Sequence, residues 1–255
     1  MNNIKIRLIC GSLCMSTAER NFYMILSERL KTIADFIPHN SIVGDIGTDH
    51  GYLPVYLIEN RISKKVIATD ISSNSLMKIQ QFVDLKGLND SIDIRLGDGL
   101  NVIKPFEIDT VVIAGMGGLL IRDILNFNKD ITDTITHFIL QPNIATRELR
   151  EYLYNNNFFI TDEKLVKESN KFYEIIYARK EKYLLKNSIY LEVGEKLISN
   201  NDPLLKEFIN YKIAVAEDII KKLDDKDTSR AKERYVELIN KIKDLKAVLK
   251  EIESY

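Results

Sequence analysis

The sequence predicts an α/β protein in which an open, largely parallel β-sheet is followed by a helical hairpin. Between about residues 41 and 180, apolar segments typical of strands alternate with segments typical of helices. Such alternation indicates a parallel sheet with right-handed crossovers. The first apolar segment ends in a glycine-containing turn, as in nucleotide-binding sheets. From about residue 200, apolar residues instead repeat every 3.5 residues, the spacing of coiled coils.

The chain begins with a segment that lacks periodicity and continues into an amphipathic helix. Residues 1–24 show no clear repeat, and one hypothesis is that translation starts at Met24, which would make them a non-native leader. From Met24 to Ile37, apolar residues recur at helical spacing, and Pro38 ends this pattern.

The central part of the chain contains seven candidate strands and four candidate helices. We expect strands at Ile42–Ile46, Lys65–Thr69, Ile92–Leu96, Thr110–Ala114, Phe138–Gln141, Phe159–Leu165 and Phe172–Arg179. We expect helices at Leu53–Asn60, Ser73–Lys86, Leu119–Asn126 and Thr146–Asn155, with Gly87 ending the second of these. The last two strands have no helix between them, which predicts an antiparallel edge.

The C-terminal part predicts a second, helical domain. Apolar residues step by four and three from Ile209 to Leu223 and again from Ala231 to Ile252, with the polar segment Asp224–Asp227 between them as a turn. Two such helices would form an antiparallel coiled-coil hairpin, although ordinary amphipathic helices packed on the core remain an alternative. We place the sheet domain at residues 25–185 and the helical domain at residues 200–255.

Composition excludes several classes of protein. A net charge of −1 disfavours a wholesale basic nucleic-acid binder, while leaving room for a local basic patch. No apolar run approaches the roughly 18 residues of a membrane span. The two cysteines, Cys10 and Cys14, have no histidine beside them, so we expect free thiols in a reducing cytoplasm and no metal site.

The turn after the first strand has an unusual chemistry for a nucleotide pocket. It contains Asp45, Gly47, Asp49 and Gly51 in the order D-x-G-x-D-x-G rather than G-x-G-x-x-G. Two carboxylates would repel phosphates, so we expect a nucleoside-like ligand without them. An NAD-dependent oxidoreductase is therefore disfavoured.

Acidic residues follow each of the first three strands. Asp45, Asp70 and Asp98 would meet at the carboxyl edge of the sheet, and their order matches the amino-acid, ribose and adenine parts of S-adenosylmethionine. Taken alone, Asp70 could equally cap a helix, and Met116 could belong to the core. The candidate cofactor site comprises Asp45, Gly47, Thr48, Asp49, Asp70, Ile71, Asp98, Gly99, Ala114, Gly115 and Met116.

Five motifs then resemble those of one family. They are Leu26–Leu30 (LSERL), Asp45–Pro54 (DIGTDHGYLP), Arg95–Leu100 (RLGDGL), Ile113–Gly118 (IAGMGG) and Ile139–Asn143 (ILQPN). In this order they are similar to the motifs of the bacterial tRNA (adenine(22)-N(1))-methyltransferase family, TrmK, from about Met24 to the C-terminus. The resemblance implies a Rossmann-like class I methyltransferase sheet with a C-terminal coiled-coil hairpin. It also implies methyl transfer from S-adenosylmethionine to adenine N1 in the D-arm region of tRNA.

The reaction that the resemblance implies depends chiefly on positioning. Adenine N1 carries its own lone pair, so no strong base is required, but its Watson–Crick edge must be exposed. Candidates for contact with the base are His50, Tyr52 and Asn143, and candidates for contact with RNA phosphates are Arg29, Lys31, Arg147 and Arg150. We expect tRNA as partner, a monomer or weak dimer, and no membrane. A non-catalytic S-adenosylmethionine- or RNA-binding protein remains the alternative.

Overall fold

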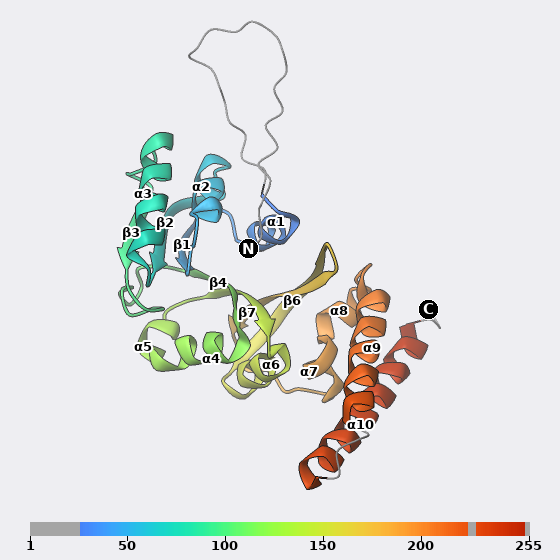
Figure 1. Cartoon of the computed structure of the whole chain (residues 1–255). Helices are drawn as coiled ribbons and strands as arrows, with labels where there is room; N and C mark the ends of the chain where they lie inside the picture. Colours follow the sequence, from blue (N-terminus) through green and yellow to red (C-terminus); the bar gives the residue numbers. More distant parts are fainter. Residues whose placement is uncertain (1–25, 224–227, 253–255) are drawn as a thin grey trace, which may run out of the picture.

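A single seven-stranded sheet organises the molecule. A computed structural model describes residues 26–223 and 228–252, and its strand order is β3-β2-β1-β4-β5-β7-β6 (Figure 1). The first five strands in this order are parallel, whereas β7 is antiparallel to both neighbours, which confirms the predicted antiparallel edge. The strands are β1 (Ser41–Ile46), β2 (Ser63–Asp70), β3 (Ile92–Leu96), β4 (Thr110–Gly117), β5 (His137–Ile144), β6 (Phe158–Glu168) and β7 (Lys171–Lys180).

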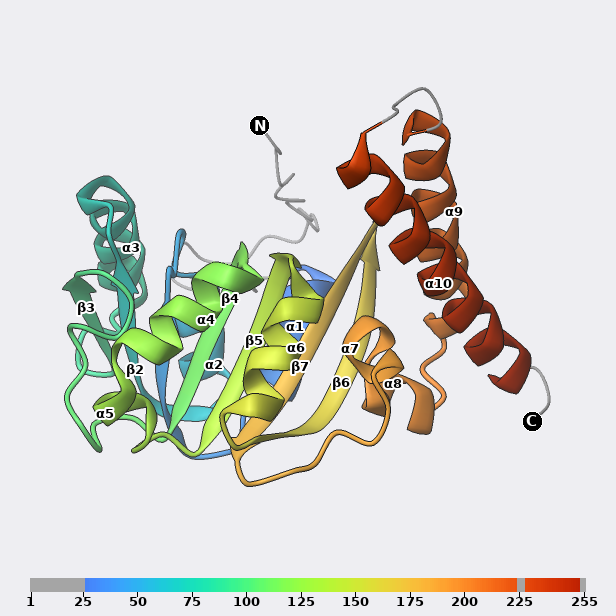
Figure 2. The same ribbon diagram turned by 90° about the horizontal axis from the view of Figure 1, so that it is seen from below.

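Helices cover both faces of the sheet (Figure 2). On one face lie α1 (Glu28–Asp35), α2 (Tyr52–Glu59) and α3 (Ser73–Lys86); on the other lie α4 (Gly118–Phe127), α5 (Lys129–Thr132) and α6 (Thr146–Asn155). Successive strand residues face opposite sides, so Val112 packs in the α1–α3 cluster whereas Val111 and Ile113 pack in the α4–α6 cluster. This burial on both faces explains why the strands are almost continuously apolar.

Local capping sets the helix boundaries. The backbone amide of Leu30 donates to the Ser27 hydroxyl, so α1 begins at Glu28, four residues after the predicted start at Met24. Gly87 ends α3 with a φ of +66°, as predicted. The short helix α5 was not predicted, because a single helical turn is too short to show the 3.6-residue repeat of apolar residues. Residues 1–24 and the predicted turn at 224–227 lie outside the described residues.

The C-terminal part forms a helical hairpin that packs on the sheet edge. It contains α7 (Ile189–Val193), α8 (Glu195–Ser199), α9 (Leu205–Leu223) and α10 (Ser229–Ile252). The predicted hairpin is confirmed: apolar residues of α9 and α10 share one cluster, and Leu165 of β6 and Phe172 of β7 join it. Tyr235 was expected in this seam but is 40% exposed. Within the described ranges, no helix combines the length and apolarity needed to cross a membrane.

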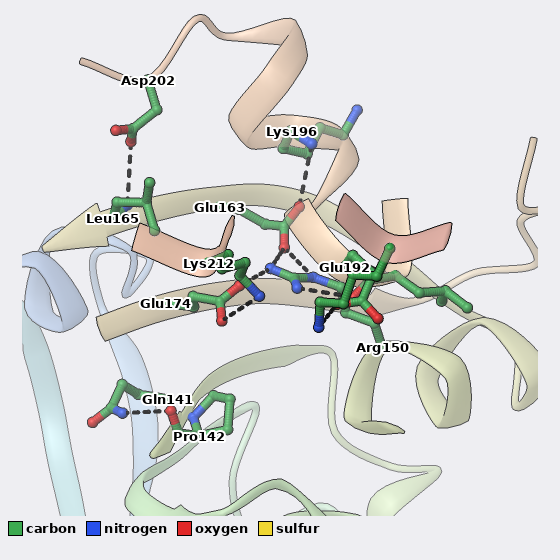
Figure 3. A network of polar contacts seen from close by, with 12 residues as sticks. Gln141, Pro142, Arg150, Glu163, Leu165, Glu174, Glu192, Lys196, Asp202 and Lys212 are labelled. Carbon is green, nitrogen blue, oxygen red and sulfur yellow. Dashed lines mark hydrogen bonds and ion pairs between the residues drawn. The ribbon is translucent and has the colours of Figure 1, made fainter. Parts of the chain in front are cut away.

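A buried ion network joins the sheet to these helices (Figure 3). The fully buried guanidinium of Arg150 in α6 lies 2.8 Å from Glu163 of β6 and 2.7 Å from Glu174 of β7, and it donates to the carbonyl oxygen of Leu191 in α7. Glu163 also accepts a hydrogen bond from the backbone of Lys196 in α8. The predicted phosphate contact by Arg150 is therefore wrong, because its charge is already neutralised inside the protein.

We expect Arg150→Met to lower the free energy of unfolding by about 3–5 kcal/mol, because it leaves Glu163 buried without its counter-ion and Glu174 with only Lys212, 3.9 Å away. Urea denaturation measures this change. The matched control is Arg234→Met, since Arg234 pairs with Glu237 on an exposed surface and should contribute little. An equal effect of the two substitutions would contradict a structural role for the buried network.

Candidate functional site

A cavity of about 460 Å³ lies at the carboxyl ends of β1, β2, β3 and β4. All eleven predicted cofactor residues line it, from Asp45 at the end of β1 to Met116 near the end of β4. Parallel strands place their carboxyl ends at one edge, and this geometry brings together residues far apart in the sequence. The structure therefore assembles the predicted cofactor set into one cavity.

Backbone geometry shapes the first turn of the cavity. Residues Gly47, Asp49 and Gly51 all have positive φ angles, and the amides of Gly47 and Thr48 both donate to the carbonyl oxygen of Thr69 at the end of β2. A Cβ atom at Gly47 would meet only the terminal methyl group of the flexible Met116 side chain, so the φ of +77° rather than lack of space favours glycine at this position.

Asp70 both shapes the pocket and faces it. One carboxylate oxygen accepts from the backbone amide of Ser72 at 2.8 Å, and the other lies 3.4 Å from the amide of Asp49. Asp70 thus connects the start of α3 with the first turn. Capping of the helix and contact with a ligand, the two roles considered for Asp70, are therefore compatible. The turn that carries Asp98 is also held at the end of β2, because the amide of Gly97 donates to the carbonyl oxygen of Asp70.

Asp45 is the acid with the most perturbed titration in this cavity. It is 5% exposed, and burial raises its pKa to about 6, an effect that the Thr48 hydroxyl opposes and the Asp70 charge reinforces. A buried carboxylate of this kind favours a cationic partner. The α-ammonium group of an amino-acid ligand has the required charge.

The three predicted base contacts lie around the cavity, although not all in it. His50 and Tyr52 line it, with ring centroids 5.4 Å apart. Asn143 instead lines a neighbouring cavity of about 920 Å³ between the start of α6 and the helices α9 and α10. Its amide nitrogen donates to the carbonyl oxygen of Gly115 at 2.7 Å, so Asn143 contacts the wall shared with the first cavity.

The predicted phosphate contacts have different surroundings. Lys31 is exposed on α1, and Arg147 is half-exposed, 3.1 Å from Glu192. Arg29 lines the first cavity, where its guanidinium donates to the Gln141 side chain at 2.6 Å and lies over the Tyr173 ring. Contact of Lys31 and Arg147 with RNA stays a prediction, and Arg29 has its partners inside the site.

Several lining residues escaped the sequence analysis. Thr69 is fully buried beside the cavity, and within the described structure its hydroxyl has no hydrogen-bond partner. Its place directly before Asp70 could have suggested it. Leu30 of α1 and Leu120 and Ile124 of α4 form an apolar part of the cavity wall. No local sequence pattern identifies them as lining residues. The donor set fits a ligand with an ammonium group, hydroxyls and an apolar body, and the described residues contain no cluster suited to a metal ion.

Comparisons with known proteins agree with this geometry. The family model TrmK, tRNA (adenine(22)-N(1))-methyltransferase, matches residues 43–247. The tRNA (adenine(22)-N(1))-methyltransferase of Bacillus subtilis is 42% identical over 153 residues, which cover 60% of this chain and 64% of that enzyme, slightly under two thirds.

Solved structures cover more of the chain. The crystal structure of B. subtilis TrmK has a TM-score of 0.81 at 34% identity, covering 88% of this chain and 99% of that one. TrmK of M. capricolum, in complex with S-adenosylhomocysteine, has a TM-score of 0.78 at 29% identity and covers 90% and 100%. A Streptococcus pneumoniae protein in complex with S-adenosylmethionine has a TM-score of 0.80 at 28% identity and covers 88% and 100%.

We expect Asp45→Asn to stabilise the ligand-free protein at pH 8, and less so as the pH falls towards 5. The folded-state pKa of about 6 lies above the ordinary value of 3.8, so folding stability decreases as the pH rises through this interval. Removing the charge should recover about 2–3 kcal/mol above pH 7. Urea denaturation at both pH values tests this, and a gain independent of pH would contradict it.

Proposed function

The chain belongs to the TrmK family of tRNA (adenine(22)-N(1))-methyltransferases, as its motifs predicted, and we propose that it methylates N1 of adenosine 22 in tRNA with S-adenosylmethionine as methyl donor. The observation that carries this proposal is the cavity lined by Asp45, Asp70 and Asp98, which lie at or just beyond the carboxyl ends of β1, β2 and β3. Relatives of the same fold bind S-adenosylmethionine or S-adenosylhomocysteine.

Each part of the cavity suits one part of the cofactor. Asp45 and the first turn would hold the amino-acid end, Asp70 would accept hydrogen bonds from the ribose hydroxyls, and Asp98 would accept from the adenine amino group. When bound, S-adenosylmethionine supplies an electrophilic methyl group on a sulfonium. The carboxylates favour this cationic ligand and oppose the phosphates of NAD, which removes the ground for the oxidoreductase alternative.

The protein's share of the chemistry is to orient the adenine and accept its developing charge. The N1 lone pair requires alignment rather than deprotonation, so positioning supplies most of the rate. Tyr52 presents a ring that could stack on a base, and His50 and Asn143 lie on either side of the region between β1 and β5. Carboxylates and oriented carbonyl groups stabilise the positive charge that appears on the base.

The substrate RNA would approach along this edge. The exposed side chains of Lys31 and Arg147 would contact phosphates, and the target base must leave its pairing for its Watson–Crick edge to enter. All the named groups come from one chain, so the proposal holds for a monomer as for a weak dimer. A tRNA substrate supports a cytoplasmic location.

The direct test is transfer of labelled methyl groups from S-adenosylmethionine to unmodified tRNA, followed by mapping of the modified nucleoside. We expect N1-methyladenosine at position 22. A tRNA with guanosine at that position should accept no label, because guanine N1 carries a proton rather than a free lone pair. Cofactor binding without methyl transfer to any tRNA would instead favour a non-catalytic binding protein.

We expect Asp70→Ala to weaken S-adenosylmethionine binding by roughly 1–3 kcal/mol, because the ribose hydroxyls lose their acceptor. Isothermal titration calorimetry measures the affinity, and circular dichroism verifies folding. The control is Asp218→Ala on α9, an exposed acid remote from the cavity. Unchanged affinity in folded Asp70→Ala protein would remove Asp70 from the cofactor site.

A further inference from the structure

A fully buried amide, Gln141 near the end of β5, connects the candidate cofactor and base sites. Its oxygen accepts from the Arg29 guanidinium at 2.6 Å and from the backbone amide of Gly115 at 3.2 Å. Its nitrogen donates to the carbonyl oxygen of Pro142 at 2.9 Å (Figure 3) and to the side-chain oxygen of Asn143 at 3.1 Å. The side-chain oxygen and nitrogen of Gln141 therefore both have partners.

These contacts hold an irregular part of β4. The pairing of β4 with β5 shifts around Gly115, which has a φ of +79°. The amide of Gly115 donates to Gln141, and its carbonyl oxygen accepts from Asn143. Two side chains of β5 thus fix both polar backbone atoms of a residue that lines the cofactor cavity.

Arg29 reinforces the orientation of this unit. A guanidinium only donates hydrogen bonds, so the Gln141 amide turns its oxygen to Arg29 and its nitrogen to Asn143, the orientation that the Gly115 amide and the Pro142 carbonyl oxygen also require. The Asn143 amide then turns its own nitrogen to Gly115. Arg29 is itself anchored, because its backbone amide donates to Glu168 of β6 at 2.9 Å and its guanidinium lies 5.4 Å from the centre of the Tyr173 ring.

We propose that Gln141 is a positioning residue for methyl transfer. Arg29 anchors Gln141, and Gln141 fixes the position of the Asn143 amide relative to Gly115 in the wall of the cofactor cavity. This inference rests on the proposed function and reassigns Arg29 from phosphate contact to anchor. Misplacement of reacting groups by about 1 Å can cost on the order of 100-fold in rate. The cofactor acids Asp45, Asp70 and Asp98 do not belong to this hydrogen-bonded unit, so cofactor affinity should depend on it little.

Gln141→Leu tests this role, since leucine keeps the approximate bulk and removes every hydrogen bond. With enzyme in excess over tRNA and with saturating cofactor, we expect the single-turnover methylation rate to fall by about 10- to 100-fold, while the dissociation constant for S-adenosylmethionine changes far less. The matched control is Thr132→Val, which removes a buried hydrogen bond to the Leu125 carbonyl at the opposite end of the sheet. It should cost stability alone and leave the rate unchanged.

Arg29→Met provides an independent arm in case Gln141→Leu does not fold. We expect it to lower kcat, and we expect the double variant to be hardly slower than the worse single variant, because both act through one unit. A raised KM for tRNA with kcat unchanged would instead identify Arg29 as a phosphate contact and overturn the proposal, as would a wild-type rate in folded Gln141→Leu. An inactive wild-type protein would refute the proposed function itself, which keeps the two failures distinguishable.

Discussion

The relative placement of the sheet and the helical hairpin depends on the charge of Arg150. Its partners Glu163 and Glu174 lie on adjacent antiparallel strands, and the network continues outward to Lys212 of α9, 3.9 Å from Glu174. A buried charge of this kind is costly unless it is fully paired. The partners of Arg150 come from several elements. If one of these elements moved away, it would leave an unpaired charge in an apolar environment.

A second set of ion pairs extends this constraint to the site. Glu192 of α7 pairs with Arg147 in the first turn of α6 and with Lys241 of α10, at 3.1 and 2.6 Å. The helix α6 begins at Thr146, three residues after Asn143. The larger cavity lies between these elements, so the hairpin forms one wall of a space that opens beside the candidate base contact. The C-terminal helices thus border the same cavity as Asn143, the predicted base contact.

The contrast between Asp70 and Arg150 shows what could be predicted from sequence. Asp70 was found because strand order alone brings the carboxyl ends of parallel strands to one edge, and the hairpin was found because its repeat is local. Arg150 resembled a surface cation on an amphipathic helix, since its partners lie 13 and 24 residues further along the chain on other elements. The hydrogen bond by which Arg29 anchors Gln141 joins residues 112 positions apart and had no local signal either.

The buried charge in the cofactor cavity differs from that of Arg150. Among the described residues, no cation forms an ion pair with Asp45, and its pKa is raised because the Thr48 hydroxyl only partly offsets the effect of burial. A ligand ammonium group would restore the balance, so part of the free energy of binding comes from relieving a cost already present in the folded chain. An anionic ligand would instead increase the cost of burying the charged Asp45 carboxylate. The carboxylates of this turn would therefore select for a cationic cofactor by repulsion as well as by attraction, which a glycine-rich dinucleotide loop cannot do.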